Sequence, residues 1–140
     1  MQFPLLIVAS DGWVDYVKKD KDIGAFNYIA IKKYNKLKPL IFDAAESVWQ
    51  ITEISPNKPL SLLDKILAYT FYHPLIPVSF QVNKITDRPM DIIKDALTQA
   101  IDADDDILTQ WTTADELKKA VRDANSFDSL IANLKKKKAI

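Results

Sequence analysis

Residues 76–85, with the sequence IPVSFQVNKI, alternate between apolar and polar side chains. Successive side chains of a β-strand point to opposite faces of a sheet, so one face carries Val78, Phe80 and Val82, and the other carries Ser79, Gln81 and Asn83. A strand with one solvated face is typical of antiparallel sheets. The alternation therefore predicts that this segment belongs to an antiparallel sheet.

The beginning of the chain predicts a β-hairpin. Residues 4–10 (PLLIVAS) and 13–17 (WVDYV) are rich in strand formers, and they flank Asp11-Gly12, a dipeptide favoured in two-residue type I′ turns. Gly12 is one of only two glycines in the chain, which indicates a backbone reason for its presence. Residues 18–25 are mostly polar and predict a loop or one helical turn.

Two further segments predict strands. Residues 26–34 (FNYIAIKKY) are rich in aromatic and β-branched side chains, which favour a strand. Residues 39–44 (PLIFDA) and 47–54 (SVWQITEI) flank a short turn at residues 44–46 and predict a second hairpin. Apolar and polar side chains are mixed on both faces of residues 47–54, so we expect partial cover on each side.

A middle helix is predicted between the second hairpin and residues 76–85. Ser61 and Asp64 form a variant of the capping box, and apolar residues follow at helical spacing from Leu62 to Phe71. The helix should stop near residues 72–74, because the residue before a proline avoids the α-helical conformation.

The last third of the chain is predicted to be helical. Thr86 or Asp87 is expected to cap a helix with Pro89 near its first turn and one apolar stripe over residues 92–101. Residues 113–116 (TADE) form a capping box for the next helix. Ser126 is expected to cap a last helix, whose apolar face is formed by Phe127, Leu130, Ile131 and Leu134.

The order of these segments predicts an α+β fold. We expect a single domain over residues 1–140, because this length lies within the usual range for one domain. Its antiparallel sheet should contain about five strands, built from the N-terminal hairpins. The middle helix and the helical C-terminal half should cover that sheet.

The chain offers few groups for catalysis or metal binding. It has no cysteine, which excludes thiolate metal sites and cysteine nucleophiles, and its two glycines are too far apart for a phosphate-binding loop. His73 is the only histidine, and packing beside the sheet at a helix C-terminus explains it. Asp43, Glu46 and Asp64 carry no sign of a buried acid–base pair. We therefore expect no enzyme, no cofactor and no metal site.

The charge distribution is informative although lysine plus arginine and aspartate plus glutamate both total 19. Residues 85–128 hold five bases and eleven acids, a net charge of −6, whereas residues 129–140 hold four bases and no acid. The basic segments could bind nucleic acid, and the lysines concerned are Lys32, Lys33, Lys36, Lys38 and Lys135–Lys138. The acidic half would repel phosphates, and a lysine-rich helix C-terminus offsets the helix dipole, so we expect nucleic acid only as the alternative partner.

No apolar stretch approaches the ~20 residues that a membrane-spanning helix needs. The first residues also lack the basic leader of a signal peptide. We therefore expect a cytoplasmic protein without a membrane partner.

Residues 101–111, IDADDDILTQW, concentrate the acidic charge. Asp102, Asp104 and Asp106 match the first three ligand positions of an EF-hand calcium loop, but Ile107 replaces the required glycine and Thr113 the required glutamate. A junction between two helices, with one aspartate capping a short helical turn at residues 107–111, is the simplest interpretation. Three adjacent acids exceed what capping requires. A docking surface for a basic protein is the other interpretation, formed by Asp102, Asp104, Asp105, Asp106, Trp111 and Asp115.

The general plan resembles that of small bacterial immunity proteins. The resemblance consists of a short N-terminal hairpin, the second hairpin LIFDAAESVWQI at residues 40–51, and an acidic helical C-terminal half. Such proteins belong to contact-dependent inhibition and related polymorphic toxin systems. The resemblance implies a compact cytoplasmic protein that neutralises a cognate, basic toxin domain by binding and occluding it. It covers the general plan only, so no binding residue is carried over from the family.

Overall fold

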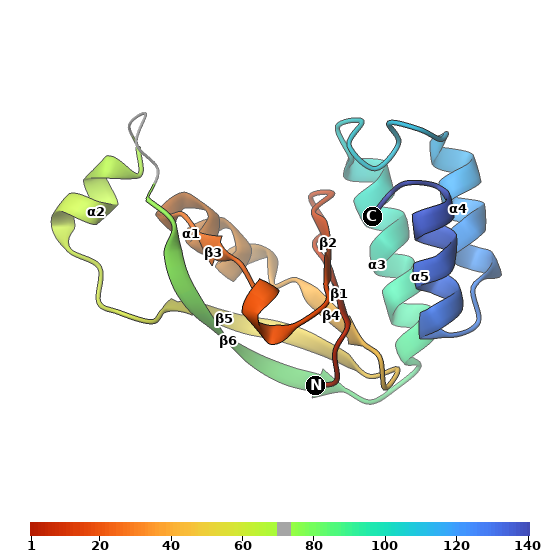
Figure 1. Cartoon of the computed structure of the whole chain (residues 1–140), viewed down its shortest axis with the longest axis horizontal. Coiled ribbons are helices and arrows are strands. Elements are labelled where there is room, and N and C mark those ends of the chain that lie inside the picture. The colour runs from red at the N-terminus through yellow and green to blue at the C-terminus, as the bar shows by residue number, and fades with distance from the viewer. Residues whose placement is uncertain (70–73) are drawn as a thin grey trace.

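The structure is a computed structural model, and it describes residues 1–69 and 74–140. Within these residues, six strands form one antiparallel, strongly curved sheet with the order β2-β1-β4-β5-β6-β3 (Figure 1). The strands are β1 (Leu5–Val8), β2 (Val14–Val17), β3 (Ala25–Phe26), β4 (Leu40–Asp43), β5 (Val48–Pro56) and β6 (Ile76–Ile85). The predicted α+β class, the antiparallel sheet and both hairpins are confirmed.

The helices are arranged on both sides of this sheet. They are the 3-10 turn η1 (Asp20–Asp22) and the α-helices α1 (Tyr28–Leu37), α2 (Leu62–Leu67), α3 (Pro89–Ala103), α4 (Ala114–Asp123) and α5 (Phe127–Lys136). Helices α3, α4 and α5 form one layer beside β1 and β4, whereas α1 and α2 lie at the other end of the molecule (Figure 1). No helix in the described part of the chain is long and apolar enough to span a membrane.

Two apolar cores result from this arrangement, one on each face of the sheet. Leu6 and Val8 of β1 pack with α3, α4 and α5, whereas Leu5 and Ile7 pack with Ile31 of α1. Because successive side chains of a strand point to opposite faces, all four residues of β1 are buried. Partial cover on each side was predicted for residues 47–54, and Val48 and Ile51 indeed belong to different cores.

The prediction of a strand over residues 26–34 is wrong beyond Phe26. Only Ala25 and Phe26 form a strand, and a helix follows directly. The Asn27 side chain accepts a hydrogen bond from the Ala30 N–H group at 2.8 Å, which caps this helix. The need to cover the second core with Ile31 outweighs the intrinsic strand preference of the β-branched residues, which is weak and depends on context.

Helix α1 also completes the hydrogen bonds of β5. Strand β4 pairs with β5 only as far as Gln50, and a β-bulge between Ile51 and Glu53 follows. The Asn35 side chain donates to the Ile54 carbonyl at 3.1 Å and accepts from the Ile54 N–H group at 2.6 Å. The Asn35 side-chain amide therefore takes the place of a pairing strand for the backbone of Ile54. Buried backbone N–H and C=O groups need such partners.

The turn of the first hairpin differs from the predicted two-residue type I′ turn. Ala9 donates to the Trp13 carbonyl at 2.8 Å, so the loop contains three residues, and Gly12 has a φ of 99°. A type I′ turn needs positive φ at two central residues, but Asp11 does not adopt it. The Asp11 carboxylate instead accepts the Trp13 N–H group at 3.1 Å, which favours the three-residue loop.

An aromatic cluster closes the curved sheet on the face that α1 covers. The Trp13 ring lies 4.5 Å from the Tyr34 ring and 5.7 Å from the Phe26 ring, and Phe26 lies 6.0 Å from Phe80 of β6. Beside this cluster, Asp11 forms an ion pair with Lys33 and accepts a hydrogen bond from the Tyr34 hydroxyl. The tip of the first hairpin, helix α1 and strand β6 therefore contact one another through this cluster.

Asp43 is the one buried charged residue among the described residues. Its carboxylate accepts N–H groups from Gln2 at 3.2 Å, Ala45 at 3.1 Å and Ser47 at 2.9 Å, and the Trp49 indole N–H at 3.0 Å. A buried charge is tolerated only when hydrogen bonds replace its hydration, and four donors achieve this. Asp43 therefore fixes the β4–β5 turn and the N-terminal residues together.

Three of the four predicted N-caps are present. Ser61 with Asp64 forms a complete capping box, Thr113 caps α4, and Ser126 caps α5. The expected caps Thr86 and Asp87 do not cap α3, because Arg88 occupies the N-cap position with a φ of 47° and no side-chain cap, although Pro89 is in the first turn as predicted. Helix α2 ends at Leu67, earlier than the predicted end near residues 72–74, and His73 lies outside the described residues.

We expect Asp43→Asn to lower the free energy of unfolding by about 3 kcal/mol, because an amide has one oxygen acceptor and its NH2 group would face N–H donors. Urea denaturation measures this change. Asp95→Asn is the matched control, since Asp95 is an exposed acid in the middle of α3. Equal stability losses for the two variants would contradict the role of Asp43.

The ion pair at the hairpin tip should make stability depend on pH. Partial burial opposes the charge of Asp11, but hydrogen bonds from Lys33 and the Trp13 N–H group and the Lys33 charge outweigh it, so its pKa lies below 3.8. A lowered pKa contributes stability above the pKa of the unfolded state, and this contribution is lost as the pH falls through the folded-state pKa.

Asp11→Asn keeps the acceptor for Trp13 and removes the charge, so it should destabilise the protein by ~0.5–1 kcal/mol at neutral pH. The difference between the wild type and this variant should shrink as the pH falls below 3.8 and vanish once the pH is below the folded-state pKa. Denaturation curves at both pH values test this. A difference that stays constant with pH would show that the ion pair does not contribute.

Candidate protein-binding surface

The acidic stretch forms the connection between α3 and α4, and Asp104 organises it. Helix α3 ends at Ala103, and the Asp104 carboxylate accepts the N–H groups of Ile107, Leu108 and Thr109 at 2.9–3.2 Å, as well as the Thr109 hydroxyl at 3.2 Å. The prediction that one aspartate caps N–H groups is confirmed. The predicted helical turn at residues 107–111 is wrong, because this segment consists of turns and bends held by Asp104.

The tip of the first hairpin packs against this loop, and the buried side chain of Leu108, within the loop, holds it in place. Leu108 is only 4% exposed and belongs to the core formed by α3, α4 and α5. A Cβ atom added to Gly12 would lie 3.1 Å from the Asp104 Cα atom and 3.3 Å from the Ala100 carbonyl oxygen. Gly12 is therefore needed for its positive φ and also for the close approach of the hairpin to the loop.

The other predicted binding residues divide into two groups. Asp102 forms an ion pair with Lys118 of α4, so its charge is partly used within the helical layer. Asp105 and Asp106 are exposed, and Asp106 has a φ of 65°. Asp115 is exposed in the first turn of α4, where an acid suits the positive end of the helix dipole. Asp105, Asp106 and Asp115 are thus exposed acids, whereas Asp102 is exposed but paired with Lys118.

Two large apolar side chains lie exposed among these acids. The exposed fraction is 67% for Trp111 and 75% for Ile107. Trp111 is one of the predicted binding residues, whereas Ile107 was predicted only as part of a helical turn. We use the name acidic loop surface for Asp105, Asp106, Ile107, Trp111 and Asp115.

The lysine-rich C-terminus lies beside the acidic loop surface. The Lys138 ammonium nitrogen lies 5.0 Å from the centre of the Trp111 ring, and Lys137 lies 4.0 Å from a carboxylate oxygen of Glu116. Lys135 lies over the Tyr16 ring of β2 at 4.5 Å. These lysines therefore make specific contacts in addition to their expected interaction with the dipole of α5.

Glu116 adds a further ionised group at this end of α4. A hydrogen bond from the Thr112 hydroxyl at 2.9 Å, followed by the nearby Lys137 charge, lowers the pKa of Glu116 below its usual value. The predicted capping box is thus only half formed, because Thr113 accepts the Glu116 N–H group while the Glu116 side chain bonds to Thr112.

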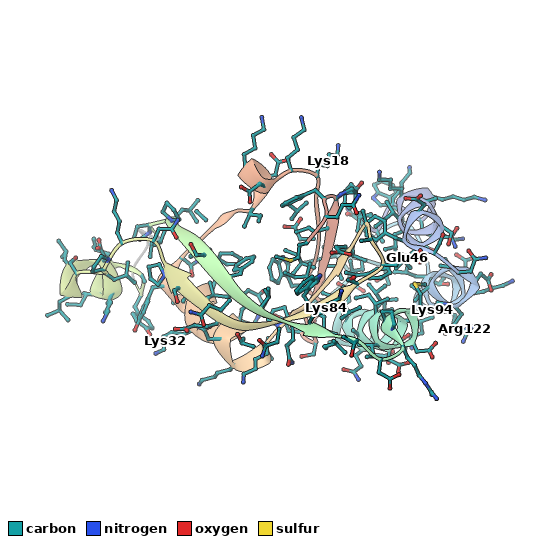
Figure 2. All side chains as sticks on the ribbon, turned by 90° about the horizontal axis from the view of Figure 1, so that it is seen from below. Lys18, Lys32, Glu46, Lys84, Lys94 and Arg122 are labelled. Carbon is teal, nitrogen blue, oxygen red and sulfur yellow. The ribbon has the colours of Figure 1, made fainter. Side chains whose placement is uncertain are left out.

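The carboxylates considered for acid–base chemistry have structural partners instead. Asp43 is fully hydrogen-bonded in the β4–β5 turn, and Asp64 belongs to the capping box of α2. Glu46 accepts the Phe127 N–H group at 2.8 Å and so caps α5 from the neighbouring layer (Figure 2). Within residues 1–69 and 74–140, no group of three or more metal-ligating side chains is placed to hold an ion.

A groove of about 590 Å³ between α3 and α4 is one alternative site. It is lined by residues of both charges, among them Asp91, Asp95, Lys118 and Arg122. Lys94 of α3 donates to the Arg122 carbonyl of α4 at 2.8 Å, and Figure 2 shows the two side chains at this edge of the molecule. The mixed charges compensate each other across the helix pair, and they indicate helix–helix packing rather than selection of a charged ligand.

Comparison with protein-family models, curated proteins and solved structures found no match to this chain.

We expect Asp104→Asn to destabilise the protein by about 2 kcal/mol, because it removes a charged acceptor that serves three N–H groups and a hydroxyl. Asp105→Asn removes the same charge from an exposed neighbour and should change stability by less than ~0.5 kcal/mol. Urea denaturation of both variants measures the difference. Similar values for the pair would mean that Asp104 does not organise the loop.

Proposed function

We propose that the chain is an immunity protein that neutralises a bacterial toxin domain by binding it through the acidic loop surface. The observation that carries this proposal is the exposure of Trp111 and Ile107 among solvent-facing acids. Aromatic side chains are frequent energetic centres of protein interfaces, and clustered charges of one sign steer a partner of the opposite sign. The mechanism is occlusion of the toxin.

The way the loop is held supports the same proposal. Asp104 and Leu108 fix its backbone, so the exposed side chains are presented with little freedom to lose on binding. Lys138 places an ammonium group over the Trp111 ring within the same chain, which illustrates the kind of contact that a basic partner would make. A partner lysine or arginine would occupy an equivalent position.

The alternative, a nucleic-acid-associated protein, receives less support. Helix α1, with its lysines, and the C-terminus of α5 lie on different sides of the β1–β2 hairpin, so the two basic segments form no common surface (Figure 1). Lys33 forms an ion pair with Asp11, and Lys137 and Lys138 contact Glu116 and Trp111. These lysines are therefore engaged within the chain.

The proposal predicts different kinetic effects for the charged and the aromatic residues. With a cognate toxin domain as the partner, Asp105→Asn/Asp106→Asn should slow association about tenfold at low salt and weaken its salt dependence. Trp111→Ala should mainly speed dissociation, with a loss of affinity of about 30-fold or more. Stopped-flow association and surface plasmon resonance measure the two rates.

Asp91→Asn/Asp95→Asn is the matched control, because both acids are exposed on α3 away from the loop. It should leave both rates within about twofold of the wild type, apart from a small steering effect. The proposal fails if the Asp105/Asp106 variant binds with unchanged affinity and unchanged salt dependence.

A further inference from the structure

The end of the molecule opposite the acidic loop carries a second exposed apolar surface. Most of the large exposed apolar side chains of the described residues lie here, on the segment that joins β5 to β6. We call this surface the α2 tip, and it consists of Leu62 (75% exposed), Leu63 (63%), Ile66 (54%), Tyr69 (63%) and Leu75 (69%). Figure 1 shows that α2 projects beyond the sheet at this end.

The α2 tip is built around a short helix, Leu62–Leu67, that has a defined apolar side. Leu62, Ile66 and Tyr69 follow the spacing i, i+4 and i+7, so they share one side of the helix and its continuation. The Ser61–Asp64 capping box fixes its start. The Tyr69 ring lies 6.5 Å from the Tyr28 ring of α1, and its hydroxyl accepts a hydrogen bond from Lys32 at 3.4 Å.

Lysines flank this apolar tip. Helix α1 contributes Lys32, and Lys58 and Lys65 lie on the projecting segment itself, which carries one acid, Asp64, in its first helical turn. The ammonium groups of Lys32 and Lys65 lie 5.6 Å and 5.9 Å from the centre of the Tyr28 ring, next to Tyr69. An apolar helix with flanking lysines combines the two features with which proteins bind anionic lipid surfaces.

We propose that the α2 tip binds the surface of an anionic lipid bilayer, with its apolar side chains in the interface and its lysines at the lipid headgroups. A bilayer accepts a projecting tip without a matching groove. A second copy of the chain fits less well, because a two-fold contact between tips would bring the same lysines together. The acidic loop surface lies at the other end of the molecule (Figure 1). Its repulsion by an anionic bilayer bound at the α2 tip would therefore be weak.

This inference departs from the sequence-based expectation of no membrane partner, and it is compatible with the absence of a membrane-spanning helix from the described residues. It is also independent of toxin binding, since the two surfaces share no residue.

The test is flotation of the purified full chain with vesicles of phosphatidylcholine alone or of phosphatidylcholine mixed with phosphatidylglycerol. The wild type should float with the anionic vesicles at low salt and remain unbound with the neutral ones. Leu62→Ser/Ile66→Ser should lower the partition coefficient about tenfold or more, because two aliphatic side chains leave the interface. Lys58→Gln/Lys65→Gln should lower it about tenfold, because two cations leave the headgroup region.

Matched controls lie at the other end of the molecule. Ile107→Ser removes an equally exposed apolar residue, and Lys119→Gln/Lys136→Gln removes two exposed lysines from α4 and α5. Both should float like the wild type. Because all substituted side chains are exposed, we expect every variant to fold like the wild type, and circular dichroism melting curves check this.

Three results would overturn the inference. The first is a wild type that does not float with anionic vesicles at low salt. The second is a Leu62/Ile66 variant that floats like the wild type, because adsorption would then involve charge alone. The third is a concentration-dependent dimer in sedimentation velocity that the Leu62/Ile66 variant abolishes, since the tip would then be covered by a second copy.

Discussion

The buried carboxylate of Asp43 connects the parts of this structure that the sequence keeps far apart. It binds the N–H group of Gln2 at the beginning of the chain and shapes the turn after β4. That turn places Glu46, with a φ of 62°, where its side chain reaches the Phe127 N–H group. The position of α5 relative to the sheet therefore depends on a turn that one carboxylate holds.

The second general feature is a sheet with an apolar core on each face. Leu6 and Val8 are buried against the layer of α3, α4 and α5, and Leu5 and Ile7 belong to the core that α1 covers. The bulge at Thr52 lets Ile54 stay with Ile51 in the same core, although their spacing would otherwise place them on opposite faces. The curvature that follows brings Phe80 to the aromatic cluster around Phe26.

Local signals predicted much of the fold, and contacts between distant residues account for the rest. The alternation around Phe80 and the caps at Ser61, Thr113 and Ser126 predicted their elements, because each depends on neighbouring residues alone. Residues 28–34 were wrongly predicted as a strand from their aromatic and β-branched side chains, because their helical state depends on distant residues of the core around Ile31. At the candidate site, the sequence predicted the cluster of acids and Trp111. It predicted one capping aspartate without identifying it as Asp104, and it did not predict that Ile107 would be exposed or that Lys138 would reach Trp111.

The contact of Gly12 with the backbone of Asp104 has a consequence for how the acidic loop could be studied or transferred. The acidic loop packs against a hairpin tip that lies about ninety positions earlier in the sequence. A synthetic peptide covering residues 101–115, or the same loop inserted between two helices of another scaffold, would lack this packing contact. Insertions or deletions in the hairpin and in the loop are therefore expected to be tolerated only in matched combinations, so that the two segments behave as one unit of sequence variation.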